Sequence, residues 1–244
     1  MPSQISIIIP ALNEEDVLTR TLHNLALLNP PPHEILLVDG GSQDRTVEIA
    51  MKAGIRVLIA PQPGRSRQMN LGAKVATGKI LCFLHADTLV PNDLVTIIER
   101  VLAQPTIVGG GFISLMTASD TTRWATSLHN YLKTYYAAII FRPLLFLKGL
   151  RILFGDQVIF CRRHDFWDCG GFDPELPIME DADLCIRMCE YGSIYLVDRI
   201  VQSSDRRVAE WGELKANLIY LYIGCLWGIG VSGDYLKQFY EDVR

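Results

Sequence analysis

The sequence predicts an α/β fold in which helices flank a mostly parallel central sheet. Short apolar segments alternate with amphipathic segments four times in the first hundred residues, which is typical of strands joined by crossover helices. Two of the apolar segments end at an aspartate, Asp39 and Asp87. Because ligands bind at the carboxyl ends of strands in open α/β sheets, the same pattern predicts a functional site at that edge.

The first half of the chain supplies the four regular units. Its first strand is expected at residues 5–9, a β-branched run closed by Pro10, and apolar residues from Val17 to Leu25 then recur at helical spacing. Further strands are expected at residues 34–38, 57–60 and 80–84. The helices of the later units are expected at residues 46–54, 69–75 and 91–102, and small residues such as Gly72 allow the third helix to pack closely on the sheet.

The regular alternation ends after Pro105. Strands are expected at residues 108–115, at 155–160, where Gly155-Asp156-Gln157 opens the strand, and at 194–197. A helix is expected to begin at the acidic run 179–184 and to continue to Gly192, followed later by a polar loop at 203–207 and a helical tail to residue 244. The sequence therefore predicts one large domain whose second half is less regular than its first.

Residues 122–154 form a long aromatic and basic segment with two equally weighted interpretations. It suits an amphipathic segment at a membrane surface, and it suits helices packed on the edge of the sheet. The longest apolar run, at residues 218–231, has about fourteen residues, whereas a spanning helix needs about twenty. That run is therefore interpreted as a buried or interfacial helix.

Composition excludes several classes. The net charge of −4 argues against a nucleic-acid footprint, which is normally basic and clustered. Six cysteines without a Cys-x-x-Cys pair are interpreted as buried free thiols. No basic segment leads into an apolar signal region at the amino terminus, so a cytoplasmic location is predicted.

Carboxylates at three separate places are expected to converge on one edge of the sheet. Asp39 and Asp87 end strands, and Asp181 begins a helix. Asp87 would hold a divalent cation that neutralises a diphosphate leaving group, and Asp181 would accept the proton of an incoming hydroxyl. The structural alternative is helix capping at both Asp87 and the Glu180-Asp181 pair.

Several motifs resemble those of the family 2 glycosyltransferases, which have the GT-A fold. The matching residues are Pro10-Ala11-Leu12-Asn13-Glu14, Val38-Asp39-Gly40-Gly41-Ser42 with Asp44 and Thr46, Asn70-x-Gly72 with Ala76 and Gly78, Asp87, Gly170-Gly171-Phe172, and Glu180-Asp181. The resemblance implies metal-assisted, inverting transfer of a sugar from a nucleotide-diphosphate sugar to a hydroxyl acceptor. The cation implied is Mn²⁺ or Mg²⁺.

The resemblance also implies roles for single residues. Glu14 and Asp39 would bind the ribose and base, Asp87 the metal, and Asp181 would be the general base, with Glu180 beside it. The donor side would comprise Pro10, Asn13, Glu14, Asp39, Gly41, Arg65, Arg67, Asn70, His85, Ala86 and Arg206. The acceptor side would comprise Asp156, Gln157, Gly171 and Phe172. Within a single domain of residues 1–244, residues 1–104 would form the donor half, 105–203 the acceptor and catalytic half, and 204–244 the tail.

A narrower likeness is to the bacterial branch named radical-SAM/selenodomain-associated transferase 2, through residues 64–70, 84–88 and 155–157. The chain departs from the wider family at the Asp-x-Asp metal motif, which reads His85-Ala86-Asp87. This imidazole would donate to a phosphate or ribose oxygen, bind metal through nitrogen, or be a structural histidine at the strand end. Met69 replaces the family's arginine before Asn70, which leaves Arg65 or Arg67 either to meet the diphosphate or to remain solvated turn charges.

The Gln-x-x-Arg-Trp motif of processive synthases is absent, so a single transfer is predicted, and Arg206 and Arg207 would close over the diphosphate. The alternatives are a sugar-phosphate nucleotidyltransferase and a catalytically inactive scaffold. The former would be expected to carry a Gly-rich phosphate loop after the first strand, which the sequence lacks. A lipid or small-molecule acceptor, a peripheral membrane contact and a homodimer all remain open.

Overall fold

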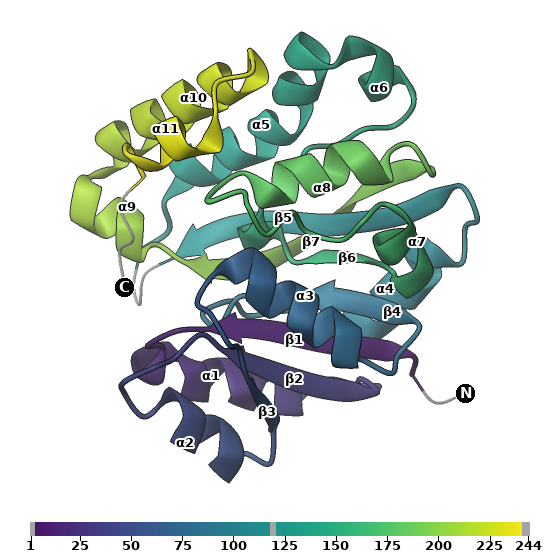
Figure 1. The fold of residues 1–244 in the computed structure, drawn as a ribbon, viewed down its shortest axis with the longest axis vertical. Helices are drawn as coiled ribbons and strands as arrows, with labels where there is room; N and C mark the ends of the chain where they lie inside the picture. Colours follow the sequence, from purple (N-terminus) through teal and green to yellow (C-terminus); the bar gives the residue numbers. More distant parts are fainter. Residues whose placement is uncertain (1–2, 118–120, 241–244) are drawn as a thin grey trace.

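A seven-stranded sheet forms the centre of the protein in a computed structural model that describes residues 3–117 and 121–240 (Figure 1). The strand order is β3-β2-β1-β4-β6-β5-β7. The strands are β1 (Ile5–Ala11), β2 (Glu34–Asp39), β3 (Arg56–Ile59), β4 (Ile80–Phe83), β5 (Ile107–Thr117), β6 (Ile159–Arg162) and β7 (Ser193–Ser204). All neighbouring strands are parallel except β6, which is antiparallel to both β4 and β5. The predicted mostly parallel α/β sheet is confirmed.

Helices cover both faces of this sheet. Their bounds are α1 (Glu15–Ala26), α2 (Thr46–Lys52), α3 (Arg65–Val75), α4 (Leu94–Leu102), α5 (Trp124–Phe141), α6 (Pro143–Leu147), α7 (Arg163–Asp168), α8 (Glu180–Met188), α9 (Arg206–Trp211), α10 (Glu213–Gly228) and α11 (Gly233–Lys237). The apolar core beneath α1, α2 and α4 lies on one face, and the core beneath α3, α5, α7 and α8 lies on the other. In Figure 1, α3 and α8 lie in front of the sheet.

Strand β1 is central in the sheet because its side chains are buried on both faces. Ile7 and Ile9 belong to one core and Ile8 belongs to the other, and all three side chains are fully buried. The small Gly72 lets α3 lie directly on this strand, because a Cβ at residue 72 would stand 2.4 Å from Ile8 Cγ2. The close helix-to-sheet packing predicted from small residues is therefore present at this position.

Two elements of the second half differ from the sequence prediction. Residues Gly155–Gln157 form a 3₁₀ turn, η1, and not the opening of a strand, because Val158 takes a left-handed conformation with φ of 53° before β6 begins. The last strand is twelve residues long, and residues 203–204, predicted as loop, belong to it. Its polar residues Asp198 and Arg199 lie in a bulge opposite Phe112 and Ile113 of β5, where the register shifts.

Helices α5 and α10 run side by side in the same direction above the sheet. Thr126 near the start of α5 bonds to Glu213 at the start of α10, and Gly228 at the end of α10 lies against Phe141 at the end of α5. Of the two interpretations of residues 122–154, the structure shows packed helices, because the inner face of α5 is buried against the rest of the protein. Within residues 3–117 and 121–240 no helix has both the length and the apolar character needed to cross a membrane.

Candidate active site

A cleft of about 590 Å³ opens at the carboxyl edge of the sheet. The antiparallel direction of β6 matters here, because it places the start of that strand, and so the preceding turn η1, at the same edge as the ends of β1 and β4. The cleft is lined, among others, by Pro10, Glu14, Arg65, His85, Ala86, Asp87, Asp156, Glu180, Asp181 and Arg206. These ten predicted site residues come together although they are spread over almost 200 positions of the chain.

One charged cluster of the cleft joins the tail to the first strands. Nη2 of Arg206 lies 2.8 Å from Oε2 of Glu14 and 3.2 Å from Oδ2 of Asp87. Burial raises the pKa of the Asp87 carboxyl, although the arginine opposes this shift. A single guanidinium thus stands between two carboxylates, which shows that this position favours positive charge.

A second cluster surrounds Arg65 at the start of α3. Its guanidinium pairs with Glu180 and, at 3.1 Å, with Oδ2 of Asp181. Burial raises the pKa of Asp181 to about 7, the neighbouring carboxylates add to this shift, and Arg65 opposes it. Oε2 of Glu180 is buried without a hydrogen-bond partner in the described part of the chain. The cluster therefore holds one carboxyl that titrates near neutrality and one oxygen that is ready to accept a hydrogen bond.

His85 stands beside the second cluster as a neutral ring. Burial and the nearby Arg65, Arg207 and Arg206 lower its pKa to about 3. Nη1 of Arg65 lies 3.3 Å from its Nε2. Because a guanidinium only donates, Nε2 accepts and the ring proton belongs on Nδ1. This proton is available to an oxygen acceptor.

The turn at Gly155 touches both His85 and the second cluster. A Cβ at residue 155 would stand 2.3 Å from Nε2 of His85 and 3.1 Å from Oδ2 of Asp181. No side chain fits there without displacing one of these two groups. The absence of a side chain at this position is therefore part of the site's geometry.

Asp39, Asn13 and Gly41 lie outside the lining of the cleft and shape the loops beneath it. The buried Asp39 carboxylate accepts the N–H groups of Gly41 and Ser42 at 2.8 and 2.9 Å. Asn13, at a φ of 56°, accepts the N–H of Gln43 through its side chain at 2.8 Å. The two motifs thereby lock the loops after β1 and β2 to each other, and the predicted role of these three residues in donor binding stays a prediction.

Five further predicted residues also lie outside the lining. Arg67 is paired at 3.1 Å with the exposed Glu175. The Asn70 side chain binds both backbone groups of Phe172, at 2.7 and 3.0 Å, next to Gly171, and so fixes the loop that leads to α8. The side chain of Gln157 is buried and bonds to Thr134 and to backbone.

Sequence reasoning missed the contribution of α5 and α10 to the cleft. Asn130, Lys133 and Tyr220 line it, and Asn130 Nδ2 donates to Oδ2 of Asp156 at 2.9 Å. The buried face of α5 includes Thr126, Ser127, Asn130, Lys133 and Thr134. A signal existed in the sequence, because this polar stripe has helical spacing inside an apolar segment. The sequence did not show that this polar stripe faces the cleft and not the solvent.

A mostly parallel sheet with helices on both faces, and carboxylates gathered at its carboxyl edge, is the arrangement of the GT-A glycosyltransferases. The model of the family described as "Glycosyl transferase family 2" matches residues 6–170. The chain belongs to this family, and the protein is a glycosyltransferase.

Individual relatives agree with this assignment. The chain is 28% identical over 221 residues to the PGL/p-HBAD biosynthesis glycosyltransferase of Mycobacterium bovis, covering 88% of this chain and 80% of the relative. Glucosyl-3-phosphoglycerate synthase from Mycobacterium tuberculosis, solved in complex with Mn²⁺, UDP and phosphoglyceric acid, superposes with a TM-score of 0.66 at 20% identity, covering 94% of this chain and 79% of that one. TarS of S. aureus superposes with a TM-score of 0.62 at 14% identity, covering 97% and 69% of the two chains. These structures share the GT-A fold.

Proposed function

We propose that the protein is an inverting glycosyltransferase that moves one sugar from a nucleotide-diphosphate sugar to a hydroxyl acceptor, with Asp181 as the general base. The observation that carries the proposal is the Asp181 carboxyl in the cleft, held by Arg65 and titrating near neutrality. A base is most effective when its pKa lies close to the working pH. Family membership favours this activity over nucleotidyl transfer and over an inactive scaffold, and the narrower bacterial branch stays a prediction of the motifs.

The chain's own residues account for the proton and for orientation. The acceptor oxygen attacks the anomeric carbon on the face opposite the diphosphate, and the bond to the diphosphate oxygen breaks as the new C–O bond forms. Asp181 takes the hydroxyl proton, while Arg65 fixes the direction of the carboxylate. Oε2 of Glu180 accepts a hydroxyl of the bound sugar or acceptor, and Nδ1–H of His85 donates to an oxygen of the donor.

A divalent cation, Mn²⁺ or Mg²⁺, fits the first cluster. The guanidinium between Glu14 and Asp87 marks a position that attracts positive charge, and carboxylate oxygen is the ligand type these ions prefer. Within residues 3–117 and 121–240 no three His, Cys, Asp or Glu side chains form a ready-made metal site. We therefore assign Asp87 as the protein ligand, with donor phosphates expected to complete the set. When bound, the cation neutralises charge on the diphosphate.

Calorimetric titration with a panel of nucleoside diphosphates and their sugars, with and without Mn²⁺, tests the proposal. We expect Mn²⁺-dependent binding of the nucleotides of one nucleobase and loss of that binding in Asp87→Ala. The control Asp93→Ala, which removes a half-exposed aspartate six residues further on, should bind normally. Release of nucleoside diphosphate from the sugar conjugate then reports turnover. Asp181→Asn is expected to bind the donor and to lose turnover by about 10²–10⁴-fold. Full turnover by Asp181→Asn would rule out its role as base.

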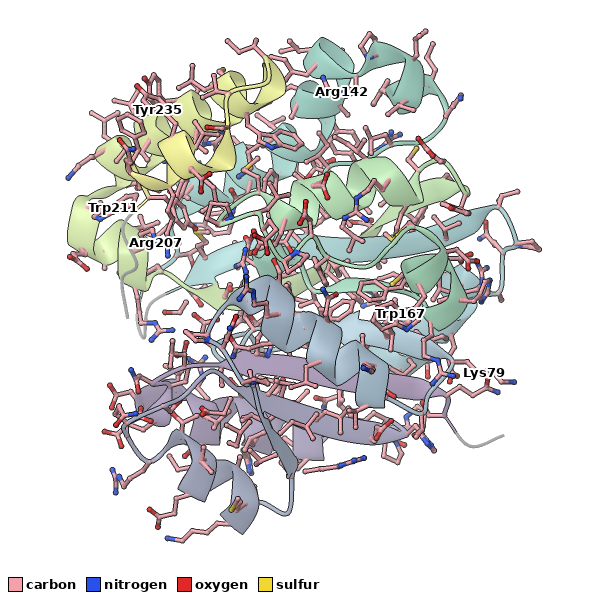
Figure 2. All side chains as sticks on the ribbon, viewed as in Figure 1. Lys79, Arg142, Trp167, Arg207, Trp211 and Tyr235 are labelled. Carbon is pink, nitrogen blue, oxygen red and sulfur yellow. The ribbon has the colours of Figure 1, made fainter. Side chains whose placement is uncertain are left out.

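We also propose that the outer face of α5, α6 and α10 docks on an anionic bilayer. Large apolar side chains there are strongly exposed, as for Leu144 at 76%, Leu147 at 80% and Leu214 at 76%. Further exposed members of this face are Trp124, Leu128, Leu132, Ile139, Ile140, Leu218, Leu221 and Tyr222. Figure 2 shows Arg142 where α5 meets α6.

Charge identifies a membrane as the occupant of this face. Residues 121–154 contain five basic side chains and no acidic one. Lys133 is buried in the cleft and Arg123 is paired with Asp205, which leaves Arg142, Lys148 and Arg151 to complement anionic lipid headgroups and to repel a second copy of this chain. The helices α5 and α10 that carry the apolar face also line the cleft with Asn130 and Tyr220, so a lipid-borne acceptor would reach the cleft from that surface.

Co-sedimentation with vesicles measures this docking. We expect binding to phosphatidylglycerol vesicles at low salt, weakening at high salt, and about tenfold weaker binding by Leu147→Glu. Leu27→Glu, an exposed leucine after α1, is the matched control and should bind normally. Absence of binding, or a dimer that Leu147→Glu dissociates, would contradict the proposal.

A further inference from the structure

Lys133 is a buried ammonium group with no oxygen partner in the described part of the chain. It projects from α5 into the lining of the cleft, and the residue is only 9% exposed. Its Nζ lies 3.6 Å from the ring centroid of Phe154 and 5.6 Å from that of Tyr220. No oxygen of residues 3–117 or 121–240 accepts a hydrogen bond from it or forms an ion pair with it. All three of its donors are therefore open to a ligand.

The two aromatic rings and Asp156 favour the charged form of this amine, but none of them accepts a hydrogen bond from it. Cation–π contacts contribute electrostatic attraction and no hydrogen-bond acceptor. Burial lowers the pKa of Lys133 to about 8, and Asp156 opposes that shift. A buried charge without a hydrogen bond destabilises the fold, so a ligand that supplies a charged oxygen gains from an interaction that the protein has left open.

The segment 154–156 connects Lys133 to the base. Phe154 packs under the ammonium group, and the next residue, Gly155, lies against Oδ2 of Asp181. Asp156 completes the segment and is held by Asn130, one helical turn before Lys133. The ammonium group and the carboxyl that receives the acceptor's proton therefore both line the part of the cleft next to this segment, whereas Arg206 pairs with Asp87 in the other cluster.

We infer that Lys133 binds an acidic group of the acceptor, a phosphate or a carboxylate, while the acceptor's hydroxyl faces Asp181. The inference rests on the proposed function, since it assigns the class of acceptor for that same reaction. A neutral acceptor would leave the ammonium group unpaired, and a cationic acceptor would be repelled by it. The acidic group belongs either to a lipid headgroup or to a small soluble molecule.

Three related probes separate charge from hydroxyl recognition: glycerol, glycerate and glycerol 1-phosphate. With the protein saturated in nucleoside diphosphate and Mn²⁺, so that the diphosphate position is filled, calorimetry measures the affinity for each probe. We expect glycerate and glycerol 1-phosphate to bind at least about tenfold more tightly than glycerol. Lys133→Met should lose that preference, Lys133→Arg should keep part of it, and Lys148→Met, the same change at an exposed site, should keep all of it.

The outcomes distinguish the inference from the function on which it rests. If the nucleotide binds and the donor turns over, but all three probes bind alike or Lys133→Met retains the preference, the acidic-acceptor inference is wrong and the function stands. If no nucleotide binds, the function itself fails. Lys133→Gln serves as the second variant if Lys133→Met does not fold. Stimulation of donor turnover by phosphatidylglycerol vesicles or by glycerol 1-phosphate identifies the lipid or the soluble source.

Discussion

Replacing the base should stabilise the protein while it stops the reaction. In the folded state burial raises the pKa of Asp181 from its ordinary value of 3.8 to about 7. Each pKa unit corresponds to 1.36 kcal/mol, so ionising this carboxyl costs the folded state about 4 kcal/mol once the pH exceeds 7. Asp181→Asn cannot ionise and avoids this cost.

Because the pKa of Asp181 is raised in the folded state, this carboxyl lowers folding stability as the pH rises from about 4 to about 7. Below about pH 4 the carboxyl is protonated in both the folded and the unfolded chain, and it has no effect. Between about pH 4 and pH 7 the unfolded chain ionises first, so stability falls as the pH rises; above pH 7 the loss is complete. Asp181→Asn also loses the 3.1 Å contact to Arg65, which offsets part of the gain. We expect its advantage over the wild type to grow by about 3 kcal/mol between pH 5 and pH 8.

Urea denaturation of both proteins at pH 5 and pH 8 measures this difference. Asp183→Asn is the matched control, because it removes a carboxylate from the same helical turn, where Asp183 is paired with Arg187 and half-buried. A difference between Asp181→Asn and the wild type that does not change with pH would refute the reasoning.

Three further variants probe other parts of the fold and site. Arg206→Gln leaves two carboxylates without their guanidinium, so Mn²⁺ alone should bind about tenfold more tightly and the nucleoside diphosphate more weakly, by calorimetry. Gly72→Ala should destabilise the protein by about 1–3 kcal/mol in urea, because its Cβ would overlap Ile8. Gly224→Ala, in open space on α10, should not be destabilised and is its control. Gly155→Ala should fold and lose donor turnover by up to about 100-fold, since the new methyl group would stand 2.3 Å from Nε2 of His85 and 3.1 Å from Oδ2 of Asp181 and must displace the imidazole and crowd the base. Unchanged turnover would show that the turn moves aside without disturbing these groups.

The parallel half of the fold was predictable because its signal is local. Runs such as the one at Ile7 to Ile9 are apolar on both faces, short and β-branched, a combination that favours a strand covered on both sides. The direction of β6 was not predictable from its residues, because a four-residue apolar strand reads the same in either direction. The turn before it depends on a left-handed Val158, a conformation that β-branched residues rarely adopt.

The carboxylates of the site were predictable and their partners were not. Asp87 and Asp181 stand at a strand end and a helix start, which are places that the sequence pattern marks. The pairing of Arg65 with Glu180 spans 115 residues, and no local pattern encodes a contact of that separation. For Arg206 the position over the diphosphate stays a prediction, and its pairing with Glu14 and Asp87 could not be predicted from the sequence.

The bare backbone at residue 155 limits how this enzyme could acquire a new substrate. Because Gly155 touches both His85 and Asp181, any backbone shift that reshaped the neighbouring positions 154 and 156 would also move the donor-side imidazole and the base. Acceptor preference and reaction rate are therefore tied together along this turn. Asn130 and Lys133 line the same space from α5, where they contact Asp156 and Phe154 through side chains. Redesign of acceptor choice should begin with these two residues, because exchanging their side chains leaves the backbone of the turn unchanged.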